Sequence, residues 1–284
     1  MRRAVGLVLV GIASVQLGAA FAKGLFDEVS PTTIVWLRLL TSTIVLLAWA
    51  RPQLRGRTRD DWLTVLGFGL SLGTMNWAIY QSFALIPIGV AVTIEFVGPL
   101  TLALVGSRRL RDLLWVGLAA AGVVLLGAEP ADLDPVGVAW ALLAGAAWAA
   151  YILLSARTGA RWPGLDGLAV ASLVATLPLT PYVLLAHGGQ VLDTRILLVG
   201  LAVGLLSSVI PYSCELTALR TLPPSVFGIL MSLEPAAAAL AALLVLGELL
   251  TALQVAALAC VVAAVAGATA TSRGGPAQTE PAPD

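Results

Sequence analysis

Apolar residues form ten long stretches along the chain, and short polar connectors separate one stretch from the next. A helix needs roughly 17–25 mostly apolar residues to cross a lipid bilayer. The pattern therefore predicts an all-α membrane protein with ten transmembrane helices. These helices are expected at about residues 4–22, 32–50, 63–83, 88–107, 113–128, 135–156, 167–187, 195–218, 224–246 and 252–271.

Ten helices divide into two sets of five, so residues 1–128 and 129–271 are expected to form two repeats around a central cavity. An odd number of spans in each half requires the second half to be inverted in the membrane. A shift of 136 residues aligns prolines in the two halves, which supports a repeat. The aligned pairs are Pro87 with Pro223 and Pro99 with Pro235.

The first apolar stretch has a second interpretation. It follows a basic start, MRR, and ends in small residues, so it resembles a secretory signal. Its apolar part nevertheless runs for about 18 residues, which is long enough to span a bilayer. Because many further spans follow it, we favour a retained first helix over a cleaved signal.

Positive charges indicate how the helices are oriented. Loops rich in Lys and Arg stay on the cytoplasmic side of a membrane. With the N-terminus inside, thirteen of the sixteen Lys and Arg residues lie on that side, whereas Lys23 and Arg195 lie outside and Arg38 lies within a span. Both termini are thus expected in the cytoplasm, where the polar, proline-rich residues 272–284 should form a disordered tail.

Composition excludes several classes of protein. The chain is 59% hydrophobic and 11% charged, which is too little charge for the surface of a soluble domain of this size. Its net charge is zero, so no basic surface indicates a nucleic-acid partner. Cys214, Cys260 and His187 are too few and too far apart to predict a zinc site. We therefore expect no cofactor and no metal.

Five ionisable residues lie inside or at the ends of the apolar stretches, and each has two interpretations. A charge at the centre of a span costs roughly 2.5–3.5 kcal/mol on insertion scales, so it needs a partner or a function. Glu95 is either a cavity carboxylate for a substrate ammonium or a proton, or a structural partner of Arg38. Glu234 either serves the local helix geometry or acts in function, and Arg38 is favoured as a structural charge. Glu215 and Lys23 lie near opposite membrane surfaces, where each is either interfacial or functional.

Polar and aromatic residues recur at helical spacing in four of the stretches. Residues three, four or seven positions apart share a helix face. Each pair alone is more often helix packing than a site. Four such faces from both halves predict one polar cavity, in which amides and carboxylates orient a solute and aromatic rings cover its apolar part. The pairs are Asn76 with Tyr80, Trp148 with Tyr151, Tyr212 with Glu215, and Gln16 with Lys23.

Longer motifs carry a resemblance to a known family. The segments SLGTMNWAIYQSFALIPIGVAVTIEFVGPLTLAL and SSVIPYSCELTALRTLPPSVFGILMSLEPAAAA, with LGELLT after them, resemble the EamA-type branch of the drug/metabolite transporter superfamily. The likeness covers nearly the whole chain except the tail. It implies ten helices in two inverted repeats, alternating access, and a place in the bacterial inner membrane.

The resemblance also implies a function, which is the export of amino acids such as threonine and homoserine, and of related small metabolites. Trp77 stands where we expect a tyrosine, which leaves the substrate open. Arg38 and Glu234 match family motifs without a defined role. The positions that the resemblance implies as cavity residues are Asn76, Tyr80, Glu95, Trp148, Tyr151, Tyr212 and Glu215.

We therefore expect a secondary transporter that moves a small amphoteric solute through the bilayer, with protons as a candidate coupling ion. A broad-specificity metabolite or drug exporter is the alternative. An intramembrane enzyme would need a catalytic constellation, and the chain contains neither H-E-x-x-H nor G-x-S-x-G, which leaves only Glu95 with Glu234 as an acid–base pair. The sequence does not predict the oligomeric state.

Overall fold

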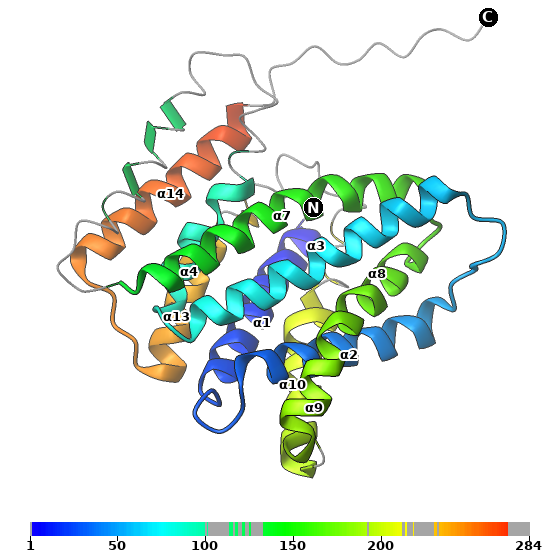
Figure 1. The fold of residues 1–284 in the computed structure, drawn as a ribbon. Coiled ribbons are helices and arrows are strands. Elements are labelled where there is room, and N and C mark those ends of the chain that lie inside the picture. Colours follow the sequence, from blue (N-terminus) through cyan, green and yellow to red (C-terminus); the bar gives the residue numbers. More distant parts are fainter. Residues whose placement is uncertain are drawn as a thin grey trace, which may run out of the picture.

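The computed structural model describes residues 2–99, 101, 114–115, 117–118, 121–122, 125, 133–191, 193–211, 214, 218, 230–231 and 233–271. Within these residues the regular structure is helical and includes no strand, as the hydropathy pattern predicts. The elements, drawn in Figure 1, are α1 (Arg2–Lys23), α2 (Pro31–Ala50), α3 (Arg59–Phe83), α4 (Ile88–Glu95), α7 (Pro135–Arg161), α8 (Asp166–Thr176), η1 (Leu177–Leu179), α9 (Thr180–Val191), α10 (Thr194–Gly204), η2 (Leu205–Val209), α13 (Glu234–Leu246) and α14 (Ala252–Thr271).

The helices agree in place with the apolar stretches of the sequence. Five segments are long and apolar enough to cross a membrane, and four further apolar segments are shorter. The stretch expected at 113–128 lies mostly outside the described residues, as do parts of its neighbours. The long segments are Arg3–Lys23, Pro31–Ala50, Arg59–Phe83, Pro135–Arg161 and Asp166–Gly189, and the shorter ones are Ile88–Pro99, Thr194–Val209, Glu234–Leu246 and Ala252–Ala264.

Local chemistry fixes where the helices begin. The first turn of a helix leaves backbone N–H groups without intrahelical partners, and side-chain oxygens can accept from them. At α2, the Ser30 hydroxyl accepts from the Thr33 backbone N–H at 3.2 Å. At α3, the Thr58 hydroxyl accepts from the Asp61 N–H while the Asp61 carboxylate accepts from the Thr58 N–H, a reciprocal capping box. Both helix starts are therefore specified by the sequence around them.

The span expected at 224–246 is described only in part, because residues 224–229 and 232 lie outside the described residues. Hydropathy places Pro235 inside a helix over 224–246, whereas the described helix begins at Glu234 and carries Pro235 in its first turn. Proline costs little there because a first-turn N–H has no intrahelical acceptor to lose. The Glu234 side chain lies at the positive end of the helix dipole, where an acidic group is favoured. Gly247, with a φ of 69°, ends the helix in the left-handed conformation.

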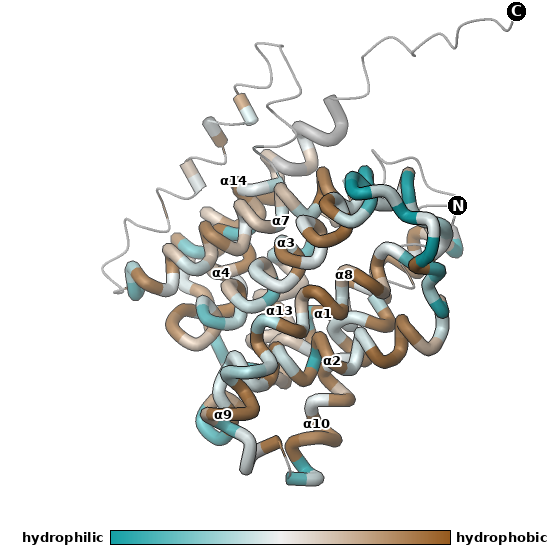
Figure 2. The backbone as a smooth tube through the Cα atoms, turned by 45° about the vertical axis from the view of Figure 1, so that its right-hand side comes forward, coloured by the Kyte–Doolittle hydropathy of each residue, from teal (hydrophilic) through white to brown (hydrophobic). Residues whose placement is uncertain are grey.

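The helices pack into one bundle. In Figure 1, α3 and α7 run side by side, and α8 and α2 follow beneath them. On the other side α1 contacts α13 and η2, and α13 contacts α4. Figure 2 shows hydrophobic positions along these helices, with hydrophilic positions gathered at the connection between α2 and α3 and near the turn between α9 and α10. The arrangement brings segments from both halves of the chain around the same central region.

Two glycines allow α4 and α7 to touch through their backbones. A Cβ atom at Gly98, just after α4, would collide with the Gly145 carbonyl of α7. A Cβ at Gly145 would in turn lie 2.6 Å from the Glu95 carbonyl oxygen. No larger residue fits at this crossing without separating the two segments. The close approach holds the end of α4, and with it Glu95, against the middle of α7.

This crossing gives a stability prediction. We expect Gly98→Ala to lower the melting temperature of the purified protein in detergent, because the added methyl group forces α4 away from α7. Overpacking of this kind costs about 1–3 kcal/mol. The matched control is Gly6→Ala, since a Cβ at Gly6 meets no atom within 4 Å, and alanine there should leave stability unchanged or raise it. An equal melting temperature for the Gly98 variant and the wild type would contradict the crossing.

Candidate functional site

A cavity of about 130 Å³ lies at the centre of the bundle. Its walls come from α1, α2, α3, α4, α7, η2 and α13, so segments far apart in the sequence build it together. The volume is large enough for several water molecules or a small solute. The sequence-predicted residues that line it are Gln16, Arg38, Asn76, Tyr80, Glu95, Trp148, Tyr151 and Glu234.

Glu95 is the most exceptional of these side chains. It is the last residue of α4 and only 8% exposed. Within the described residues, its carboxylate has neither a hydrogen-bond donor nor a cation within ion-pair distance. A buried carboxylate without a partner is costly, and this one faces a cavity. The Glu95 carboxylate is therefore available to accept hydrogen bonds from, or to pair with a positive charge of, a molecule in the cavity.

Arg38 has protein partners on one side of the same cavity. Its Nε donates to the Ser208 hydroxyl at 3.0 Å, and its Nη2 donates to the Ser207 carbonyl at 2.7 Å. Its guanidinium carbon also lies 5.5 Å from the centre of the Tyr80 ring, within the range of a cation–π contact. Arg38 thus joins α2 to η2, the segment after α10, while it also lines the cavity. Its hydrogen-bond acceptors among the described residues are a hydroxyl and a backbone carbonyl.

Neutral polar groups from α1 and α3 face the cavity beside these charges. The Asn76 amide nitrogen donates to the Leu72 carbonyl at 2.8 Å, which leaves the amide oxygen as an acceptor. The Tyr80 hydroxyl is buried and has no hydrogen-bond partner among the residues that the structure describes. Gln16 contributes a buried amide from α1. Asn76 and Tyr80 share one face of α3, as their i, i+4 spacing predicts.

Aromatic rings form the wall on the α7 side. Trp148 packs edge-on against Phe96, with ring centroids 4.7 Å apart. Tyr151 lies against Phe68 of α3, with centroids 5.2 Å apart. Both α7 residues line the cavity at i, i+3 spacing. The contacts fix the orientation of both rings and give the site an apolar surface next to its charges.

Glu234 reaches the cavity from the start of α13 and is 8% exposed. Glu95 is the last residue of α4, after which the chain makes a turn at Phe96 and is helical again at 97–99, and Glu234 is the first residue of α13. Both acids therefore lie next to a break in helical structure and line the same cavity. In transporters, helix ends at mid-membrane commonly form the solute site. The two acids thus line one cavity although they lie in different halves of the chain.

Lys23 lies away from the cavity. Its ammonium forms an ion pair with Glu248 at 2.6 Å and donates to the Ile86 carbonyl at 3.0 Å. Glu248 also accepts from the Ile88 backbone N–H at 3.1 Å. Lys23 therefore joins the end of α1 to the turn before α4 and to the segment after α13. Of the predicted Gln16 and Lys23 face, only Gln16 lines the cavity.

Two predicted residues, Tyr212 and Glu215, lie outside the described residues, as do residues 272–284. The cavity also includes residues that the sequence did not single out, among them Met75, Ser207 and Met231. The pair Ser207 and Ser208 was the available signal, because adjacent serines are unusual within an apolar stretch. They lie in η2, a π-helical turn, and such turns are frequent at functional sites.

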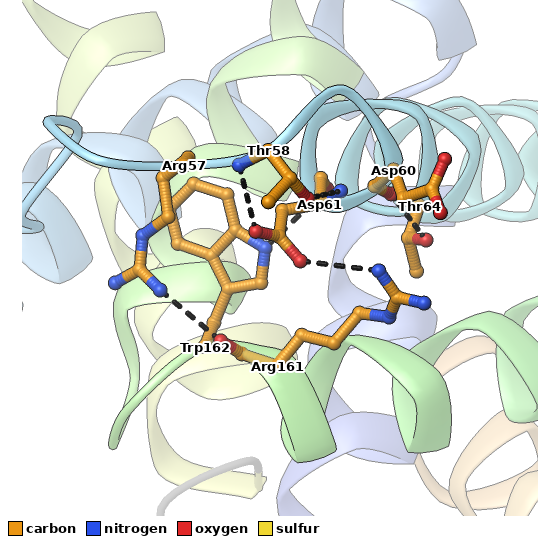
Figure 3. Close-up of polar contacts among 7 residues, drawn as sticks. All are labelled: Arg57, Thr58, Asp60, Asp61, Thr64, Arg161 and Trp162. Atoms are coloured by element: carbon orange, nitrogen blue, oxygen red, sulfur yellow. Dashed lines mark hydrogen bonds and ion pairs between the residues drawn. The ribbon is translucent and has the colours of Figure 1, made fainter.

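A separate polar cluster fastens one end of the bundle (Figure 3). The Arg57 guanidinium lies 4.4 Å from the Trp162 ring centre and donates to the Arg161 carbonyl at 3.1 Å. The Arg161 side chain pairs with Asp61 at 3.2 Å, and the Trp162 indole N–H points at the Asp61 carbonyl. The cluster joins the connection before α3 to the end of α7. None of these residues lines the cavity, so we read the cluster as structural.

Comparisons with known proteins agree with this architecture. The EamA-like transporter family matches residues 2–128 and again residues 135–270. The threonine/homoserine exporter RhtA of Escherichia coli K12 is 42% identical over 270 residues, which are 94% of this chain and 91% of that protein. The RhtA protein of Salmonella typhimurium LT2 gives the same identity and coverage.

More distant matches are consistent with these. An uncharacterized transporter of Bacillus subtilis, YwfM, is 28% identical over 241 residues, with 79% of each chain covered. A solved crystal structure superposes with a TM-score of 0.63 at 20% identity, covering 94% of this chain and 98% of the other, which shows a shared fold. The relatives are named as transporters and not as enzymes. With two family matches that together span nearly all of its length, the chain belongs to the EamA-like transporter family.

Proposed function

We propose that this protein exports threonine, homoserine and related small amino acids from the cytoplasm. The main support for the proposal is the central cavity, which is lined by the buried carboxylate of Glu95, a group without a hydrogen-bond or ion-pair partner among the described residues. The RhtA relatives, 42% identical across almost the whole chain, are named for these two substrates. An amino acid has an ammonium, a carboxylate and a short side chain, and the cavity offers a complement for each.

The binding arrangement follows from the groups that line the cavity. The Glu95 carboxylate receives the substrate ammonium, which provides an ion-pair partner that the described residues do not place within 4.0 Å of it. The Asn76 amide and the Tyr80 hydroxyl bind polar atoms of the solute. Trp148 and Tyr151 cover its carbon skeleton. Tyr212 and Glu215 complete the proposed site, although they lie outside the described residues.

The proposed transport cycle uses two inverted halves. Residues 1–128 and 129–271 each contribute five spans, and rocking of one half against the other exposes the cavity alternately to the two sides of the membrane. The separate family matches at 2–128 and 135–270 support this division. Contacts from both halves around the one cavity support it as well.

We also propose a position in the bacterial inner membrane with both termini in the cytoplasm. The positive-inside distribution of Lys and Arg supports this orientation. A single cysteine introduced at Gln53, in a Cys214→Ala, Cys260→Ala background, should react with a membrane-impermeant maleimide only after the cells are permeabilised. A cysteine introduced at Gly189 should react in intact cells. The opposite pattern would invert the topology.

Efflux of radiolabelled threonine tests the site. In cells that lack their own threonine exporters, we expect Glu95→Gln to lower the initial efflux rate roughly 10- to 100-fold, because it removes a charge-assisted contact with the ammonium. Asn76→Ala should cause a smaller loss, about 3- to 10-fold, because it removes a neutral hydrogen bond. Membrane-inserted protein is quantified for every variant so that rates are compared per molecule.

The matched control for these variants is Glu28→Gln. Glu28 is exposed and pairs with Arg195 at 2.8 Å, away from the cavity, so efflux should stay at the wild-type rate. Wild-type efflux in both Glu95→Gln and Asn76→Ala would remove the proposed site. Resistance to unrelated amphipathic toxins without threonine or homoserine efflux would instead favour a broad-specificity exporter.

Export against a gradient requires an energy source, and we propose a proton exchanged for substrate at Glu95 or Glu215. Intramembrane carboxylates serve as proton carriers in many transporters. Reconstituted vesicles with an imposed pH difference should accumulate threonine against its gradient. Accumulation that persists after an ionophore abolishes the proton gradient would show that protons are not the coupling ion.

A further inference from the structure

The guanidinium of Arg38 is held from one edge only. Nε donates to the Ser208 hydroxyl and Nη2 donates to the Ser207 carbonyl, and both acceptors belong to η2. Within the described residues, Nη1 has no hydrogen-bond acceptor. The side chain is 6% exposed, and the surface that it does expose lines the cavity. Nη1 of the fixed Arg38 guanidinium can therefore donate hydrogen bonds to a molecule in the cavity.

Arg38 and Glu95 share the cavity without forming an ion pair. The Arg38 charge acts electrostatically on Glu95, yet no nitrogen and oxygen of the two lie within 4.0 Å, the distance that defines the ion pairs elsewhere in the molecule. A buried charge is costly unless an opposite charge or hydrogen-bond partners compensate it. Here the protein holds them apart, with Arg38 anchored on η2 and Glu95 on the crossing of α4 with α7.

A molecule that carries both signs of charge would complement this arrangement. We propose that Arg38 binds the α-carboxylate of the transported amino acid through Nη1, while Glu95 binds its ammonium. This inference rests on the proposed function and deepens it, because it makes the site selective for zwitterionic α-amino acids over amines of the same size. The guanidinium suits the role, since its planar donors match carboxylate geometry and it keeps its charge when buried.

A purely structural role for Arg38 makes a different prediction. If the side chain only ties α2 to η2, its removal disturbs the cavity as a whole and weakens every ligand alike. If Arg38 binds the carboxylate, its removal weakens only ligands that have a carboxylate. The ratio of two affinities, one for threonine and one for its amide, separates these cases.

The experiment measures binding of L-threonine and L-threoninamide to the purified full-length protein in lipid nanodiscs, followed by tryptophan fluorescence, because Trp148 lines the cavity. The titrations are made at about pH 6, below the usual pKa of an α-amino group, so both ligands carry an ammonium. We expect the wild type to bind threonine roughly 10- to 100-fold more tightly than threoninamide. In Arg38→Gln the ratio should fall to near one, mainly through weaker threonine binding.

Two further variants complete the test. Arg38→Lys keeps the positive charge and should restore part of the preference for threonine, which also provides a folded variant if Arg38→Gln does not insert. Arg195→Gln removes an exposed arginine outside the cavity and should keep the wild-type ratio. A wild-type ratio near one, or an unchanged ratio in Arg38→Gln, would overturn this inference while threonine efflux could still support the proposed function. Failure of the wild type to bind either ligand would overturn both.

Discussion

An ionisable side chain inside a helical bundle in lipid must find its partners within the protein, and this constraint organises the whole molecule. Moving one such charge to the centre of a span costs roughly 2.5–3.5 kcal/mol. The chain meets this cost in two ways. Lys23 pairs with Glu248 near one end of the bundle, and Arg38 donates to η2 near the middle. Glu95 has no such partner among the described residues, and it faces the central cavity.

Close backbone packing is what lets the charges be held apart. At the crossing of α4 and α7, Gly98 and Gly145 bring two backbones together and fix the end of α4. At the crossing of α1 and η2, a side chain on Gly18 would collide with the Ser207 hydroxyl. Such small-residue contacts are typical of membrane helices, which gain little from burying apolar surface away from lipid. Each contact sets the position of one wall of the cavity.

Polar contacts at the ends of the bundle have a different character from those at its centre. The cluster of Arg57, Asp61, Arg161 and Trp162 satisfies its members among themselves, and so does the pair of Lys23 with Glu248. Groups at the centre keep spare donors and acceptors, as the Tyr80 hydroxyl does. The ends therefore join segments of the bundle, while the centre keeps polar groups that face a cavity.

The sequence by itself determined the helical class, the positions of the long described helices and eight residues that line the central cavity. Apolar stretches predicted α1, α2, α3 and α7 to within a few residues. A spanning helix can be recognised from the hydropathy and the length of its own segment, without knowledge of its neighbours. Polar residues such as Glu95 were found for the same reason, since they stand out in an apolar background.

Only the tertiary structure decided which of the polar helix faces meet around the cavity. Gln16 and Lys23 lie on one face of one helix, yet Gln16 lines the cavity and Lys23 pairs with Glu248 outside it. The tertiary structure also placed Ser207 and Ser208 against Arg38, although they lie 169 and 170 positions further along the chain. Such partners depend on how distant helices cross, and the crossings are set by packing of side chains and backbones that no local pattern of the sequence records.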